Sequence, residues 1–152
     1  MEQLYFKVLI ISILCIISSN AQYHPPIQNF PPDMYKAGNQ NWNISKDDYN
    51  RTYVANNFGL LEFDGLRWNL YPTPNGSIMR SVFAKDKIIY TGAYMDFGYW
   101  LRNEDGTLVY TSLSNTTGFQ TIEDEQFWNI FSHKQYILCL LYTSPSPRDS
   151  GQ

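Results

Sequence analysis

Apolar and polar positions alternate over short runs in the first half of the chain. The alternation predicts three strands, over Thr52–Ala55, Leu60–Phe63 and Arg67–Tyr71, because β-branched and aromatic residues favour a pleated, half-buried surface. Turns are predicted between them, at residues 56–59, which combine Asn with Gly, and at Asp64-Gly65, a strong two-residue hairpin signal. The stretch therefore predicts a small antiparallel sheet that needs a neighbour to cover its faces.

A similar arrangement recurs along the chain. The triplet WNI occurs at residues 42–44 and again at residues 128–130, and a weaker middle unit begins near Val82. The first two units each end in a hairpin, at Asp64-Gly65 and at Asp105-Gly106. A period of about 40–45 residues with four short strands is typical of β-propeller blades, although Tyr-rich strands can resemble one another by chance.

The sequence thus predicts an all-β fold of β-propeller blades. We expect the blades at about residues 37–75, 76–120 and 121–138, the last one incomplete. Closed propellers typically use about 4–8 blades, so a stack of under three leaves blade faces uncovered. We therefore expect the chain as printed to be prone to aggregation or partly disordered.

The N-terminal part, residues 1–21, is typical of a secretory signal peptide. An apolar run over Val8–Ile17 follows Lys7, and the small residues at 19–21 predict cleavage before Gln22. An uncleaved membrane anchor is the alternative, but the run is about half of the roughly 20 residues needed to span a bilayer. The protein is therefore expected to be exported.

Two further segments flank the predicted blades, which occupy residues 37–138. Residues 22–36 hold four prolines and predict an extended lead-in that is neither helical nor a central strand. Residues 139–149, CLLYTSPSPRD, resemble a conceptual translation of the transposon-end adaptor used in sequencing libraries. We expect residues 139–152 to be a read-through tail that does not continue the blade after Leu138; a natural Ser/Pro linker is the alternative.

Composition and motifs narrow the function. A net charge of −3 without a Lys/Arg cluster argues against nucleic-acid binding by this segment, because phosphate contacts need a basic face. Cys15 and Cys139 fall in the predicted signal peptide and tail, so no disulfide framework is expected. His24 and His133 lack metal-ligand spacing, and residues 123–125 indicate an acidic turn before a strand. Without a nucleophile, phosphate-loop or zinc-protease motif, we expect no catalytic activity, no metal and no cofactor.

One aromatic cluster is the candidate ligand-binding site. It contains Tyr94, Tyr99 and Trp100, with polar groups among them, a combination that suits sugar rings or peptide side chains. The alternative is that these rings pack between blades. In the hairpin that follows, over residues 101–113, Leu101, Leu108 and Tyr110 are expected on covered faces.

The runs GNQNWNIS (38–45), YVANNFGLLEFDGLRW (53–68), IIYTGAYMDFGYW (88–100) and EDEQFWNI (123–130) resemble the periplasmic propeller regulators of the Bacteroidetes. They are most similar to the flavobacterial triple-tyrosine-motif, helix-turn-helix regulators. The resemblance covers residues 37–138 and carries no ligand residue over. It implies one or two propellers of two-component-regulator repeats, a triple-tyrosine β-sandwich, one transmembrane helix, and a LuxR-type DNA-binding domain or a histidine kinase in the cytoplasm.

The resemblance implies that this chain is the N-terminal sensor segment of a signalling protein, at the periplasmic face of the inner membrane. Its partner would be an extracytoplasmic ligand, for instance a glycan or a peptide. Contact with DNA and with the membrane would come only through the output domain and the transmembrane helix that this chain lacks. Two alternatives remain, a secreted propeller enzyme (lyase or glycosidase) and a structural interaction scaffold.

Overall fold

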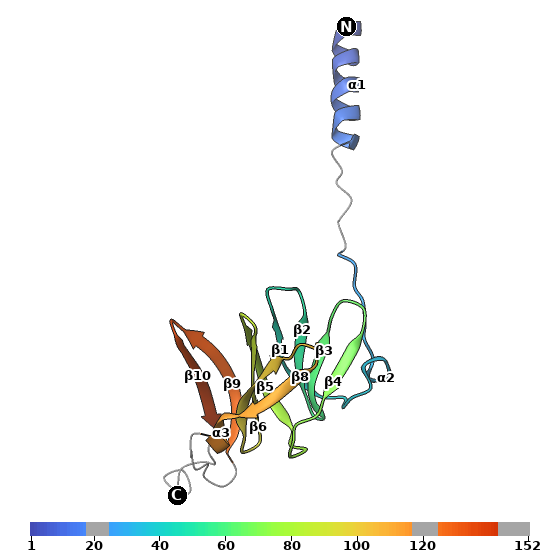
Figure 1. Ribbon diagram of the computed structural model, residues 1–152. Coiled ribbons are helices and arrows are strands. Elements are labelled where there is room, and N and C mark those ends of the chain that lie inside the picture. Colours follow the sequence, from blue (N-terminus) through green and yellow to red (C-terminus); the bar gives the residue numbers. More distant parts are fainter. Residues whose placement is uncertain (18–24, 117–124, 143–152) are drawn as a thin grey trace, which may run out of the picture.

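The structure is a computed structural model that describes residues 1–17, 25–116 and 125–142. In these residues the fold is mostly β, with ten strands in three antiparallel sheets (Figure 1). None of the three sheets closes on itself. The prediction of an all-β fold is confirmed, whereas the assignment of the sheets to propeller blades stays a prediction.

The first sheet has the strand order β1-β2-β3-β4. Its strands are β1 (Asn41–Lys46), β2 (Thr52–Asn56), β3 (Gly59–Phe63) and β4 (Trp68–Tyr71). The three strands predicted from the alternating pattern are therefore confirmed. The last turn covers residues 64–67, between the paired residues Phe63 and Trp68. In it the Asp64 carboxylate accepts hydrogen bonds from the backbone N–H groups of Leu66 (2.8 Å) and Arg67 (2.7 Å). Asp64 is a turn residue, as expected.

The second sheet repeats this order with the next four strands. They are β5 (Met79–Lys85), β6 (Ile88–Ala93), β7 (Phe97–Arg102) and β8 (Leu108–Ser112). Its last turn has the same chemistry, since the Asp105 carboxylate accepts a hydrogen bond from the Thr107 N–H at 2.8 Å. The repeating unit starts at Met79, earlier than the expected Val82.

The third sheet corrects the expected end of the β structure. It pairs β9 (Gln126–His133) with β10 (Tyr136–Tyr142), so the strand does not end at Leu138. The run from Tyr136 to Tyr142 is apolar and aromatic, and such a run favours a strand whatever its origin. Residues 143–152 lie outside the described part, and the adaptor origin of residues 139–152 stays a prediction.

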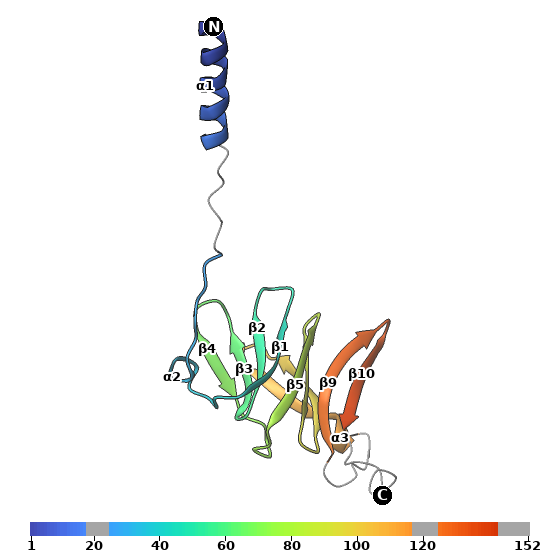
Figure 2. The ribbon, with the colours of Figure 1, turned by 180° about the vertical axis from the view of Figure 1, so that it is seen from behind.

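The three sheets stack face to face, with β1 beside β5 and β5 beside β9 (Figures 1 and 2). These three strands are called the inner strands below. The hydrophobic core lies mainly between the first two sheets. Its buried residues are Tyr53, Ala55, Leu60, Met79, Val82, Ile89, Trp100 and Leu108.

The lead-in covers the outer face of the first sheet, the face that points away from the second sheet. Phe30 packs against Phe63 and Trp68, with ring centroids 5.0 and 5.4 Å apart. The expectation that this segment contains no helix is wrong, because residues Pro32–Tyr35 form a single turn, α2. Proline is accepted in the first turn of a helix, where its missing N–H would have no partner.

Two further helices complete the described elements. Helix α1 (Glu2–Ile17) covers most of the predicted signal peptide, and α3 (Leu113–Thr116) follows β8. Among the described residues, no helix is both long enough and apolar enough to cross a membrane. The predicted cleavage site at residues 19–21 lies outside the described part, so the signal peptide stays a prediction.

One expected core position is wrong. Leu101 is 42% exposed, although Leu108 is buried. Along β7, Trp100 and Arg102 point toward the first sheet, and strand alternation turns Leu101 to the opposite face, where it pairs with Val109. No described strand of the third sheet lies beyond β9 and β10, so the outer half of that face is uncovered.

Candidate functional site

The inner strands share a feature that sequence reasoning did not find. Each has a β-bulge near its start, where the pairing register skips one residue. The skipped residues are Trp42 in β1, Arg80 in β5 and Trp128 in β9. A bulge leaves one residue outside the ladder and redirects its side chain. Three neighbouring strands therefore present a side chain at corresponding positions.

These three side chains form one cluster, which we call the bulge stack. The guanidinium carbon of Arg80 lies 3.9 Å from the ring centroid of Trp42 and 5.0 Å from that of Trp128. The two indoles are 5.9 Å apart and nearly perpendicular, at 83°. Both distances to Arg80 are within cation–π range, so the two rings hold the charge between them.

Neutral amide groups fix the bulge stack in place. The Nε of Arg80 donates a hydrogen bond to the Gln126 side-chain oxygen at 2.9 Å. The indole nitrogen of Trp42 donates to the Asn57 side-chain oxygen at 2.7 Å, and Asn57 in turn donates to Gln40 at 3.1 Å. These contacts orient the Arg80 plane without neutralising its charge.

Arg80 has no carboxylate partner among the described residues. The ion pairs there are Arg51 with Asp47 and Arg102 with Glu62. The Nη1 atom of Arg80 is buried and has no hydrogen-bond acceptor in the described part of the chain. Burial lowers the pKa of the Arg80 guanidinium from its usual value. An unpaired buried N–H of a charged group is costly, so it marks a candidate binding group.

The bulge stack adjoins a cavity on the outer face of the first sheet. This cavity has a volume of about 430 Å³, and Trp42 forms part of its lining together with Phe30, Tyr35 and Trp68. Trp42 is 37% exposed, so it contacts both Arg80 and open space. The arrangement suits the binding of a ligand with a flat apolar face, and it places a cation beside that face.

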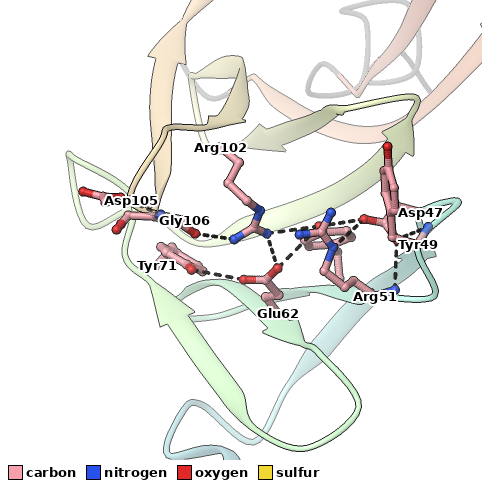
Figure 3. Close-up of polar contacts among 10 residues, drawn as sticks. Asp47, Tyr49, Arg51, Glu62, Tyr71, Arg102, Asp105 and Gly106 are labelled. Carbon is pink, nitrogen blue, oxygen red and sulfur yellow. Dashed lines mark hydrogen bonds and ion pairs between the residues drawn. The ribbon is translucent and has the colours of Figure 1, made fainter.

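A second polar cluster joins the first two sheets (Figure 3). The Arg102 guanidinium donates hydrogen bonds to the Glu62 carboxylate and to the Gly106 carbonyl. The Tyr71 hydroxyl donates to the other Glu62 oxygen at 3.0 Å. Glu62 is 2% exposed, so Arg102 and Tyr71 supply the partners that a buried carboxylate needs.

The same cluster extends into the first sheet. The Asp47 carboxylate accepts hydrogen bonds from Arg51 Nε (2.9 Å) and from the Tyr53 hydroxyl (3.1 Å). Burial of the phenol, with the charge of Glu62 nearby, raises the pKa of Tyr53 to about 12. We call Asp47, Arg51, Tyr53, Glu62, Tyr71 and Arg102 the inter-sheet clasp. Its ion pairs are formed within the chain, and one of them, Arg102 with Glu62, joins the first two sheets.

The aromatic residues predicted to bind a ligand are not brought together. Trp100 is 3% exposed, packs 4.9 Å from Tyr110, and donates a hydrogen bond from its indole nitrogen to Thr91. Tyr99 lies on the opposite face of β7, 6.5 Å from Tyr90. Trp100 is therefore a core residue, because neighbouring strand positions point to opposite faces and the first sheet covers its side.

Tyr94 is the one of the three that lies near the bulge stack. It is 38% exposed and forms an isolated β-bridge with Gln126, the residue that holds Arg80. The repeated WNI triplet was the signal for Trp42 and Trp128. Arg80 gave no such signal, because the middle unit lacks the triplet.

Two of the residues weighed as acidic or metal-binding groups, Glu125 and His133, lie in the described part of the chain. Glu125 is 4% exposed rather than part of a solvated turn, and its Oε2 has no partner among the described residues. Residues 123 and 124 and His24 lie outside the described part, and His133 is exposed. In the described ranges, no group of three His, Cys, Asp or Glu side chains could hold a metal ion.

Comparison of the chain with protein-family models, with curated proteins and with solved structures gives no match. The resemblance of residues 37–138 to periplasmic regulators therefore stays a prediction. The bulge stack itself needs no relative to be identified, because register, ring distances and hydrogen bonds define it.

Proposed function

We propose that this chain is the ligand-binding segment of an extracytoplasmic sensor in signal transduction. The stacked sheets are blades of a β-propeller, and the ligand binds at the bulge stack. The observation that carries the proposal is the stack itself, Trp42, Arg80 and Trp128 at corresponding bulges of three inner strands.

The sheet order supports the assignment to a propeller. Two four-stranded antiparallel sheets follow one another in the chain, each with its strands in sequence order, and their first strands lie side by side. Propeller blades have this order, and their first strands surround a central channel. In a propeller, the bulge stack would lie at one end of this channel.

The chemistry of the stack supports binding of an extracytoplasmic glycan or peptide. Indole faces pack well on flat apolar surfaces, and the neighbouring amides of Gln40, Asn57 and Gln126 supply hydrogen-bonding groups. Output to DNA or to a kinase, and attachment to the membrane, would belong to other parts of a longer protein, as the family resemblance implies.

Binding is tested with the full chain and a panel of soluble oligosaccharides and peptides, measured by isothermal titration calorimetry. We expect at least one panel member to bind, and Trp42→Leu and Trp128→Leu each to weaken binding about 10-fold, because each removes one ring contact. Tyr49→Leu is the control, since Tyr49 is an exposed aromatic residue in the turn after β1, away from the stack. Binding by no panel member, or equal binding by the Trp variants, would contradict the proposal.

Export and output are tested separately. Alkaline phosphatase fused behind residue 142 should be active in cells only if residues 1–21 direct export. Sequencing the genomic locus should reveal a frame that continues past Leu138 without the adaptor bases and encodes a membrane helix with a DNA-binding or kinase domain. A stop codon soon after one propeller would favour the secreted-enzyme alternative, and a locus that encodes residues 139–152 would disprove the read-through tail.

A further inference from the structure

We propose that the bulge stack is a carboxylate receptor, in which the Arg80 guanidinium binds a carboxylate of the ligand while the indoles of Trp42 and Trp128 pack on the ligand's apolar part. The inference rests on the proposed ligand-binding function and adds the chemical class of the ligand. It concerns small soluble molecules that carry a single negative charge next to a flat apolar group.

The first argument is a comparison of the arginines. Arg51 is paired with Asp47 at 2.9 Å, and Arg102 is paired with Glu62. Arg80 is also partly buried, yet no carboxylate lies within ion-pair distance of it in the described residues. A partly buried cation without a counterion is expensive unless a ligand supplies the missing charge.

The second argument is the orientation of the guanidinium. Gln126 occupies Nε, and the two indoles lie against the guanidinium group, so the edge formed by Nη1 and Nη2 is left to a ligand. Among the described residues, Nη1 has no acceptor. Two parallel N–H groups on a planar fork match the two oxygens of a carboxylate, which makes this edge a bidentate donor.

The third argument is access. Nη1 is shielded from solvent, but Trp42, which covers it on one side, is 37% exposed. Rotation of this ring, which exchanges its hydrogen bond to Asn57 for one to water, opens a path from the adjoining cavity to the guanidinium edge. Trp42 would then be the side chain whose environment changes when the ligand binds.

The charge of the site favours a carboxylate over a phosphate. The bulge stack contains one cation, and the groups that hold it are neutral amides. One guanidinium matches one negative charge, whereas a phosphate dianion would be only half neutralised. Inorganic phosphate therefore serves as a probe that should bind weakly.

The test compares matched acidic and neutral probes on the full chain by calorimetry. The sugar pair is methyl galacturonide, which carries one carboxylate, and its methyl ester, and the peptide pair is acetyl-Tyr-Glu-amide and acetyl-Tyr-Gln-amide. We expect the acid of at least one pair to bind about 10- to 100-fold more tightly than its neutral partner, as one charge-assisted contact provides. The pair that shows the difference identifies the source of the carboxylate.

Three variants assign the difference to Arg80. Arg80→Gln should abolish the preference for the acid, so that the acid and its neutral partner bind this variant with affinities within about twofold of each other. Arg80→Lys keeps the charge but loses the planar fork, so it should retain only part of the preference. Arg67→Gln is the matched control, because Arg67 is exposed in the turn after β3 and its removal changes the net charge equally. Near-ultraviolet circular dichroism checks that each variant is folded.

The outcomes separate this inference from the proposed function. Equal binding of acid and ester that depends on Trp42 and Trp128 would overturn the carboxylate assignment and leave the ligand-binding proposal standing. An acid preference that persists in Arg80→Gln, or phosphate binding tighter than that of either acid, would also overturn it. Failure of both acids to bind would likewise overturn the carboxylate assignment. The proposed ligand-binding function would then be decided by the panel of oligosaccharides and peptides alone.

Discussion

The first and second sheets pack through a continuous set of large side chains, whereas the second and third sheets meet through two small residues and a pair of stacked rings. Between the first two sheets, Tyr53, Leu60, Met79 and Trp100 are each at most 3% exposed. The clasp then links the same two sheets through the ion pair of Arg102 with Glu62. This interface combines a continuous apolar core with paired charges at its rim.

Between the second and third sheets, the contact depends on a glycine and a serine. A Cβ atom built on Gly92 would lie 2.5 Å from the Cβ of Phe127, so only glycine allows β9 to come this close. The Ser81 hydroxyl donates a hydrogen bond to the Phe127 carbonyl at 2.8 Å, and the rings of Phe97 and Phe127 stack at 5.6 Å. Farther out, Leu101 on the second sheet is exposed.

This difference implies that the two interfaces between the sheets are unequally stable. The first interface buries area along the whole width of both sheets, while the second buries area only near the inner strands. Because burial of apolar area is the main stabilising term, the first two sheets should unfold as one cooperative unit, and the third sheet should detach more easily. Since Trp128 is on the third sheet, the bulge stack depends on the weaker of the two interfaces.

The largest expected effect is on the first interface. Trp100→Ala removes a buried ring between the two sheets and should lower the free energy of unfolding by about 4 kcal/mol. Urea denaturation followed by circular dichroism measures the change. Tyr136→Ala on β10 is the control, because Tyr136 is 58% exposed and its loss should cost under about 0.5 kcal/mol. Similar losses for both variants would contradict the assignment of the main core to the first interface.

The clasp is tested by removing one charge and then both. Arg102→Met leaves the Glu62 carboxylate buried without its cation and should cost about 3 kcal/mol in urea denaturation. The double variant with Glu62→Leu removes both charges, so it should recover most of this loss. If the double variant were as unstable as Arg102→Met, the cost would come from lost packing and the clasp would not act as a charge pair.

Strands and turns could be predicted from the sequence because their causes are local. Alternation placed the strands that begin near Thr52 and Leu60, and Asp before Gly placed the turn at Asp64, where the side chain caps the backbone. Alternation also places Trp100 and Leu101 on opposite faces. It does not say which face another sheet covers, and for this reason the sequence could not tell that Trp100 would be buried and Leu101 exposed.

The bulge stack could be predicted only in part. The repeated triplet marks Trp42 and Trp128 as equivalent positions in the sequence, but the contact between their rings depends on how the sheets stack. Arg80 is chemically unlike Trp42 and Trp128. An alignment of the repeat sequences by residue type therefore does not match it with them. Arg80 corresponds to the two tryptophans only in the pairing register of the strands. Met79 pairs with Ala93 and Ser81 with Gly92, which leaves Arg80 in the bulge.

The second interface is tested by adding a single methyl group. Gly92→Ala should lower the free energy of unfolding by about 2 kcal/mol, because the new Cβ would overlap Phe127 and the Ser81 hydroxyl. We expect the fluorescence of Trp128 to change as β9 moves away, while the first two sheets stay folded. Ser132→Ala, an exposed position on β9, should leave both stability and fluorescence unchanged. Unfolding of the whole chain in one step with Gly92→Ala would show that the interfaces are not independent.

Acid should weaken the part of the clasp that lies in the first sheet. Although burial opposes it, hydrogen bonds from Arg51 and Tyr53 lower the pKa of Asp47 below its usual value. A carboxyl with a lowered folded-state pKa stabilises the fold above its unfolded pKa of about 3.9 and loses this contribution as the pH falls further. We expect urea denaturation to show a loss of stability as the pH falls below about 4, and a smaller loss in Asp47→Asn. An unchanged slope in that variant would assign the acid sensitivity to another group.

The uncovered half of the second sheet should affect self-association more than stability. Leu101 and Val109 face away from the core, at 42% and 51% exposure, and lie side by side in the strand pairing. Replacing both by Ser should change the free energy of unfolding by less than about 0.5 kcal/mol, because neither side chain is covered. The apolar face would nevertheless lose its attraction for other copies of the chain, so sedimentation velocity should show a smaller share of oligomers. Leu108→Ser, at a buried position on the neighbouring strand, should do the opposite and destabilise the fold. If the Leu101 and Val109 substitutions destabilised the protein as strongly as Leu108→Ser, a further part of the chain would have to cover this face in solution.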